Sequence, residues 1–188
     1  MIIMGIDPSV RSTGVCVWDT EHDNYAYYLV VKNSTKKLLN FKHPLLHIHH
    51  YEEESLKDLN AIQKEIAKTK AVNKILNVCG AIMDVFSPDY IVLEAIAMHG
   101  SGKLDQLSGI NYGIRKLALD KNIKFYPVSP TSNKMEFVGN GGATKDMMVD
   151  AWKGLRPEVS EFEIGKHIED LADAYSLVHY PILKYINQ

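Results

Sequence analysis

Four carboxylates occupy positions from which they could bind a divalent cation. Asp7 and Glu94 each end a short apolar run that is typical of a buried strand. Asp170 and Asp173 lie three residues apart near the start of a predicted C-terminal helix, so they share one face. A carboxylate at the end of a buried strand is costly to desolvate unless its charge is compensated. Mg²⁺ or Mn²⁺ is the usual compensation, so these four side chains are candidate metal ligands.

Each candidate also has a purely structural interpretation. Asp7 precedes Pro8, and Asp-Pro often begins a turn, so its local sequence is compatible with either role. Glu94 is a poor strand former whose charge must point into a crevice or into solvent, which favours function. Asp170 and Asp173 could belong to a solvated helix face, but the positions one turn further on are apolar. That pattern favours a site at the mouth of a largely buried helix.

Histidines are concentrated in one segment, at His43, His47, His49 and His50. A structural zinc site of a common type would also need cysteine partners, which this segment lacks. A polar surface hairpin is therefore the preferred interpretation of these residues.

The elements that must position the carboxylates alternate in the order of an α/β protein. Three β-rich stretches joined by short turns predict an antiparallel meander, and the later strands are separated by helices. We therefore expect a mixed five-stranded sheet with helices on both faces. The strands are predicted at residues 2–7, 13–18, 24–32, 90–94 and 123–128, and the helices at 55–86, 103–121, 131–138, 144–153 and 165–179.

Length and composition indicate an ordinary globular protein. The chain has 188 residues, of which 46% are hydrophobic and 23% charged, so we expect one domain over residues 1–188. Residues 33–60 are expected to be an insertion, which forms either an extra hairpin or an irregular segment. Cys16 and Cys79 lie in apolar surroundings and are expected to be buried thiols in a reducing compartment.

The sequence contains no apolar stretch approaching about 18 residues and no basic leader before an apolar run, so we expect a cytoplasmic protein with no membrane partner. Its formal net charge of −2 neither favours nor excludes nucleic-acid binding. Without the four candidate ligands, the rest of the chain has a formal net charge of +2. Any surface that binds nucleic acid must therefore come from local basic patches.

Four segments, taken in order, resemble the motifs of the RuvC-type Holliday junction resolvases. The match is specific because the order and the separation of the segments agree, although Ser9 and Val10 replace the usual Gly-Ser of the first motif. The segments are Ile6-Asp7-Pro8 with Thr13-Gly14, residues 88–94 ending in Glu94, residues 134–145 from Lys134 to Lys145, and Asp170-Leu171-Ala172-Asp173-Ala174.

The resemblance implies a ribonuclease H-like fold and a homodimer that nicks two symmetric strands of a four-way DNA junction. It also implies two Mg²⁺ ions in each active site, with Mn²⁺ able to substitute. Carried over by position, the metal ligands are Asp7, Glu94, Asp170 and Asp173, and the phosphate contacts are Lys134 and Lys145, of which Lys145 also has a catalytic role.

One departure from the family concerns substrate selectivity. Many members carry an aromatic residue after the second motif that stacks on bases at the crossover, whereas this chain has Ala95-Ile96-Ala97. Losing such a contact costs roughly 1–3 kcal/mol. A broader branched-DNA or flap endonuclease, as in phage-encoded relatives, is therefore an alternative.

Two further alternatives come from other functional classes. The first is a catalytically weak nucleic-acid-binding module on the same fold. The second follows from Asp7 and the small polar residues after it, which resemble the phosphate loop of sugar kinases and actin-like ATPases. Those proteins duplicate the fold, and this chain is too short to do so.

Overall fold

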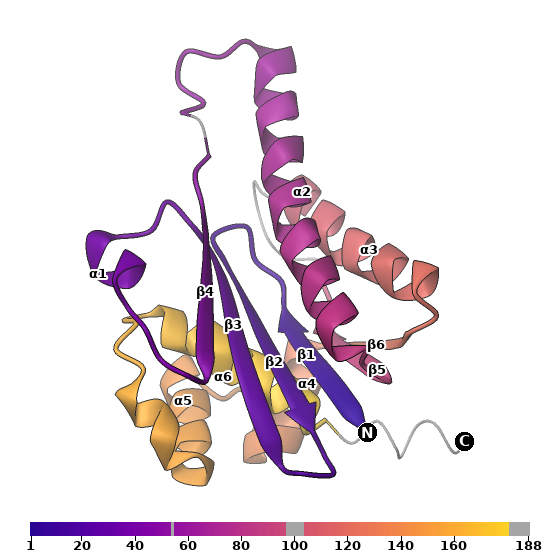
Figure 1. Cartoon of the computed structure of the whole chain (residues 1–188), viewed down its shortest axis with the longest axis vertical. Helices are drawn as coiled ribbons and strands as arrows, with labels where there is room; N and C mark the ends of the chain where they lie inside the picture. Colours follow the sequence, from indigo (N-terminus) through magenta and orange to yellow (C-terminus); the bar gives the residue numbers. More distant parts are fainter. Residues whose placement is uncertain (54, 97–103, 181–188) are drawn as a thin grey trace.

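The computed structural model describes residues 1–53, 55–96 and 104–180. They form a mixed sheet with helices on both faces, as predicted, but the sheet has six strands rather than five, in the order β4-β3-β2-β1-β5-β6 (Figure 1). The strands are β1 (Ile2–Asp7), β2 (Ser12–Asp19), β3 (Asn24–Lys32), β4 (Leu46–Tyr51), β5 (Tyr90–Glu94) and β6 (Lys124–Val128). The helices are α1 (Lys36–Leu39), α2 (Ala61–Phe86), α3 (Leu104–Asp120), α4 (Pro130–Val138), α5 (Lys145–Leu155), the 3-10 helix η1 (Pro157–Glu161) and α6 (His167–Val178).

The pairing of the first three strands confirms the predicted meander. β1 pairs antiparallel with β2, and β2 with β3, while β5 lies parallel to both β1 and β6. The centre of the sheet is apolar on both faces, as a sheet covered by helices on both faces requires. Because β1 and β5 are parallel neighbours, their carboxyl ends lie side by side at the same end of the sheet.

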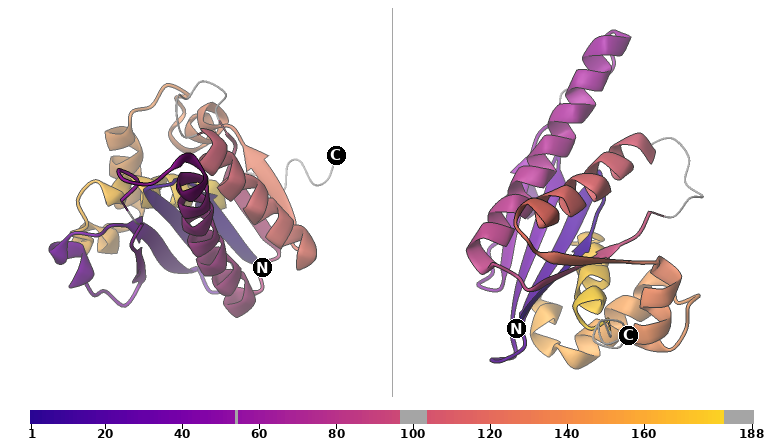
Figure 2. Two further views of the ribbon diagram at one scale, coloured as in Figure 1. Left: turned by 90° about the horizontal axis from the view of Figure 1, so that it is seen from above. Right: turned by 90° about the vertical axis from the view of Figure 1, so that its right-hand side faces the viewer.

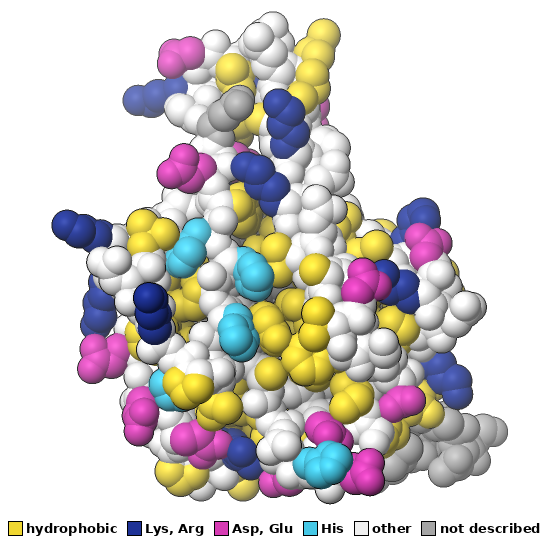
Figure 3. Space-filling view, in the orientation of Figure 1, with side chains coloured by type: hydrophobic (Ala, Val, Ile, Leu, Met, Phe, Trp, Pro, Cys, Tyr) yellow, Lys and Arg dark blue, Asp and Glu magenta, His cyan; other side chains and the backbone are white. Residues whose placement is uncertain are grey.

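The additional strand comes from the segment that carries the histidines. β4 is the outermost strand and pairs parallel with β3. The predicted surface hairpin, which would need antiparallel pairing, is therefore wrong. His47 and His49 lie on one face of β4 and stack against Tyr28, with ring centroids 4.9 and 6.2 Å apart, and Figure 3 shows histidines gathered on this open face. Polar residues at exposed edge positions obscured the strand pattern in the sequence. No three metal-ligating side chains come together here within the described residues.

Two helical layers enclose the sheet, with α2 and α3 on one face and α4, α5 and α6 on the other (Figure 2). Helix α2 begins at Ala61 rather than near residue 55, because Asn60 and Gln63 form a capping box. Its N-terminal half projects past the ends of the strands (Figure 1).

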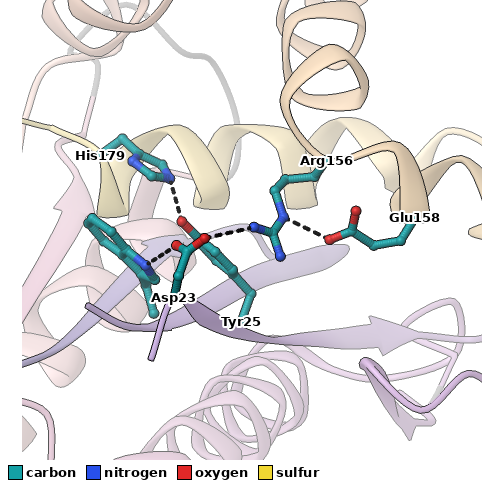
Figure 4. Close-up of polar contacts among 6 residues, drawn as sticks. Asp23, Tyr25, Arg156, Glu158 and His179 are labelled. Atoms are coloured by element: carbon teal, nitrogen blue, oxygen red, sulfur yellow. Dashed lines mark hydrogen bonds and ion pairs between the residues drawn. The ribbon is translucent and has the colours of Figure 1, made fainter. Parts of the chain in front are cut away.

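A polar network ties the opposite end of the sheet to α6 (Figure 4). The Arg156 guanidinium lies 4.2 Å from the centroid of the Tyr25 ring, donates to Glu158 Oε1 at 2.7 Å and lies 3.3 Å from Asp23 Oδ2. The Tyr25 hydroxyl is 3.3 Å from His179 Nε2, at the C-terminal end of α6. The network anchors α6 at that end, and the helix start lies at the edge where β1 and β5 finish.

Cys16 and Cys79 are both free and buried, as predicted. None of the helices in the described ranges is both long enough and apolar enough to span a bilayer.

Candidate active site

Asp7 and Glu94 end neighbouring parallel strands and point toward the same face of the sheet. Ile6 of β1 is in register with Leu93 of β5, so the next residue of each strand lies at the shared edge. Side chains alternate between faces along a strand, and Val92 packs in the core layer that contains α6. Glu94, two residues further on, therefore points toward α6, and the alternation along β1 places Asp7 on that face as well.

Two glycines allow α6 to approach the sheet closely. A Cβ atom at Gly14 would lie 2.2 Å from the carbonyl oxygen of Asp170, and one at Gly5 would lie 2.2 Å from that of Ala174. Both distances are far below van der Waals contact, so only glycine fits at either position. Gly14 is the β2 partner of Asp7, and the close approach therefore brings the first turn of α6 beside Asp7.

The four carboxylates share one electrostatic environment. Burial, followed by the charges of Glu94, Asp173 and Asp170, raises the pKa of Asp7 well above its usual value. Burial and then the charge of Asp173 raise the pKa of Glu94 to about 7. Burial raises the pKa of Asp173 to about 6, with Asp170 contributing in the same direction. Carboxylates from three distant segments therefore gather where β1 and β5 end, and each disfavours the ionisation of its neighbours.

This donor set fits a hard divalent cation. The candidate ligands supply carboxylate oxygens only, which suits Mg²⁺ or Mn²⁺ rather than a metal that prefers nitrogen or sulfur. Within the described ranges, however, no group of three or more His, Cys, Asp or Glu side chains is positioned to hold a metal ion. Mutual repulsion between ionised carboxylates opposes such an arrangement until a cation neutralises them. The fit is therefore one of donor chemistry and charge.

The two predicted lysines border the carboxylates. Lys134 and Lys145 both lower the pKa of Glu94 and Asp173 by their positive charge. Lys145 forms a salt bridge with Glu169 at 2.9 Å. Partial burial is the largest single influence on Lys145 and acts to lower its pKa. The hydrogen bond to Glu169, together with the negative charges of Glu169, Asp170 and Asp173, outweighs burial, so the pKa of the lysine is raised. Both lysines are thus cations at the rim of the acidic cluster.

Sequence reasoning missed two residues that connect the first motif to the last. His167 Nδ1 lies 2.9 Å from Ser12 Oγ and 3.7 Å from Asp170 Oδ2. His167 precedes Asp170 by three residues on the same helix face, which is the signal that could have identified it. The contact with Ser12 depends on tertiary packing.

The raised pKa values predict how stability changes with pH. A carboxyl whose folded-state pKa exceeds its unfolded value holds its proton more tightly in the folded protein. For Glu94 and Asp173 the folded values are about 7 and about 6, against ordinary values of 4.5 and 3.8. Their contribution to the free energy of unfolding therefore falls as pH rises from about 4 to about 7.

Thermal unfolding in EDTA between pH 5 and pH 8 measures this effect. We expect Glu94→Gln to flatten the pH dependence of the melting temperature relative to the wild type, and Mg²⁺ to stabilise the wild type most at the alkaline end. Identical pH profiles for wild type and variant would contradict the assigned electrostatics.

Comparison with known proteins identifies the fold. Neither a protein-family model nor a curated protein matches the sequence. The Thermus thermophilus RuvC structure matches with a TM-score of 0.61 and 16% identity, covering 98% of this chain and 96% of that chain. RuvC from the same organism in complex with a Holliday junction substrate matches with a TM-score of 0.62, 14% identity and the same coverage. The yeast mitochondrial Holliday junction resolvase Ydc2 matches with a TM-score of 0.52 and 15% identity, over 94% of this chain and 76% of that chain. The chain therefore has the ribonuclease H-like fold of the RuvC-type resolvases.

Proposed function

We propose that this chain is a Mg²⁺-dependent endonuclease that resolves four-way DNA junctions by paired symmetric nicks. One observation carries the proposal: carboxylates at the ends of β1 and β5 and at the start of α6 combine their charges on the fold of RuvC-type resolvases. Buried repulsion of this kind is unfavourable for folding alone, and cation binding would relieve it.

The proposed ligands are Asp7, Glu94, Asp170 and Asp173. Two cations held there would lower the pKa of the attacking water and stabilise charge on the leaving 3′ oxygen, giving a 5′-phosphate and a 3′-hydroxyl. Lys145 would exchange its salt bridge with Glu169 for a contact with the scissile phosphate. Lys134 would bind the phosphate from α4. Asp7 and Glu94, held at strand ends, would keep the reacting groups in a fixed geometry.

Cleavage of labelled DNA tests the proposal. A four-way junction, a flap and a linear duplex are incubated with the protein, with and without Mg²⁺. We expect symmetric nicks in the junction that depend on the metal, with the linear duplex left intact. Junction binding without metal-dependent nicking would instead indicate a binding module, and nicking of all three substrates would indicate a non-specific nuclease.

A broader branched-DNA or flap activity is the second candidate. After Glu94 the chain continues with Ala95 and Ile96, which offer no ring for stacking on bases, and Ala97 lies outside the described residues. Comparable rates on the flap and on the four-way junction would favour this candidate.

We also propose a homodimer, because paired nicks require two active sites related by two-fold symmetry. The projecting half of α2 exposes Ile62 by 74% and Ile66 by 49%, which gives an apolar surface for a second copy.

We expect the double variant Ile62→Glu/Ile66→Glu to elute as a monomer and to make unpaired nicks. Val85→Glu is a matched control, since Val85 is 75% exposed at the opposite end of α2. Light scattering after gel filtration reports the mass, and a cruciform plasmid reports whether the nicks are paired. A double variant that stays dimeric would exclude this surface as the interface.

A further inference from the structure

The additional strand β4 reaches the loop that follows Asp7. At its end, the Tyr51 hydroxyl donates a hydrogen bond of 2.8 Å to the carbonyl oxygen of Val10. Both residues are buried, at 8% and 6% exposure, and they are 41 positions apart in the sequence. A buried carbonyl needs a partner, so this contact is a specific constraint on the loop.

The position of Val10 affects Asp7 because the connection between them is short and stiff. Pro8 has a fixed φ angle, and Ser9 is held by reciprocal hydrogen bonds with Thr13, at 3.2 and 2.7 Å. Only Pro8 and Ser9 separate Val10 from Asp7, and both are constrained, so few free backbone torsions remain to absorb a displacement at Val10.

Tyr51 is itself held by its surroundings. Its carbonyl accepts a hydrogen bond of 2.9 Å from the Asn33 backbone, and the Lys74 ammonium of α2 lies 5.8 Å from the centroid of its ring. Lys74 also donates to the carbonyl of Glu52 at 2.7 Å. Burial raises the pKa of Tyr51 to about 12, so its hydroxyl keeps its proton and remains a donor at neutral pH. The donor is therefore supported by β3 and by α2.

We propose that Tyr51 is a positioning residue, whose hydroxyl fixes the loop after Asp7 and thereby aims the Asp7 carboxylate at the metal site. The inference builds on the proposed nuclease function. It also assigns a role to β4. In the strand order β4 and β5 lie on opposite sides of β1, and β4 supports the loop that follows β1. Ser12, at the far end of the loop, is fixed separately by His167.

The test is Tyr51→Phe, which keeps the ring and removes the hydroxyl. Partners that orient a ligand typically contribute 10–100-fold, so we expect kcat for junction cleavage to fall by roughly that factor while KM for DNA stays unchanged. The Mg²⁺ concentration for half-maximal thermal stabilisation should rise. Amide hydrogen exchange in a peptide covering residues 8–13 should accelerate, with no change in peptides from β5 or α6.

Tyr28→Phe is the matched control. Tyr28 lies on the same face of the neighbouring strand β3, and the variant keeps its ring stacked on His47. We expect this control to match the wild type in all three measurements.

The outcomes separate the inference from the function on which it builds. A wild type that cleaves no branched DNA would overturn the proposed nuclease. A wild type that cleaves, with Tyr51→Phe unchanged in kcat, in Mg²⁺ response and in exchange of residues 8–13, would overturn the role of Tyr51. A lower melting temperature with unchanged kcat and Mg²⁺ response would show a structural role only, and would also overturn it.

Discussion

Replacing Asp7 by asparagine is expected to abolish Mg²⁺-dependent junction cleavage and, at the same time, to stabilise the metal-free protein. The rate should fall by roughly 10³-fold, equivalent to about 4 kcal/mol of transition-state stabilisation lost with a metal ligand. Stability should rise because burial and three neighbouring carboxylates disfavour the charged form of Asp7, whose pKa they raise, whereas asparagine carries no charge. A gain of about 1 kcal/mol would raise the melting temperature by about 2–4 °C in a chain of this size.

The measurement compares melting in EDTA at pH 8 with cleavage in Mg²⁺. Asp19→Asn is a suitable control, since Asp19 also ends a strand but pairs with Ile2, at the opposite end of β1 from Asp7. Hydrogen bonding to His22 lowers the pKa of Asp19. That variant should cleave normally and should not become more stable. Full Mg²⁺-dependent cleavage by Asp7→Asn would refute the assignment of the active site.

Replacing Gly14 by alanine is expected to damage both the fold and the site. The added methyl group would meet the Asp170 carbonyl at 2.2 Å, and backbone cannot rotate away as a flexible side chain can. The start of α6 must therefore move, carrying Asp170 and Asp173 away from Asp7. Overpacking of this kind costs about 1–3 kcal/mol, and a misplacement near 1 Å can reduce the rate roughly 10²-fold.

Gly154→Ala controls for the loss of a glycine in itself. Gly154 lies in α5, and an added Cβ there meets nothing within 4 Å. Alanine should stabilise that helix by up to about 1 kcal/mol without affecting cleavage. Denaturant unfolding and junction cleavage check both variants, and a Gly14→Ala protein with wild-type stability and rate would contradict the close approach of α6.

Short-range sequence patterns were sufficient for most of the architecture. Apolar runs ending in Asp7 and Glu94 predicted two buried strands, and the helical spacing around Asp170 predicted the last helix. These features depend on local periodicity and on the high cost of an uncompensated charge at a strand end, both of which can be read along the chain.

Tertiary structure alone decided which distant residues meet. β4 was missed because an exposed edge strand with histidines has no clear alternation, and its parallel pairing with β3 is a long-range choice. The contacts of Tyr51 with Val10 and of His167 with Ser12 join segments 41 and 155 positions apart. The sequence by itself determined which residues could form the site. The packing of α6 against two glycines, which no local pattern encodes, decided that the acidic side chains share one electrostatic environment.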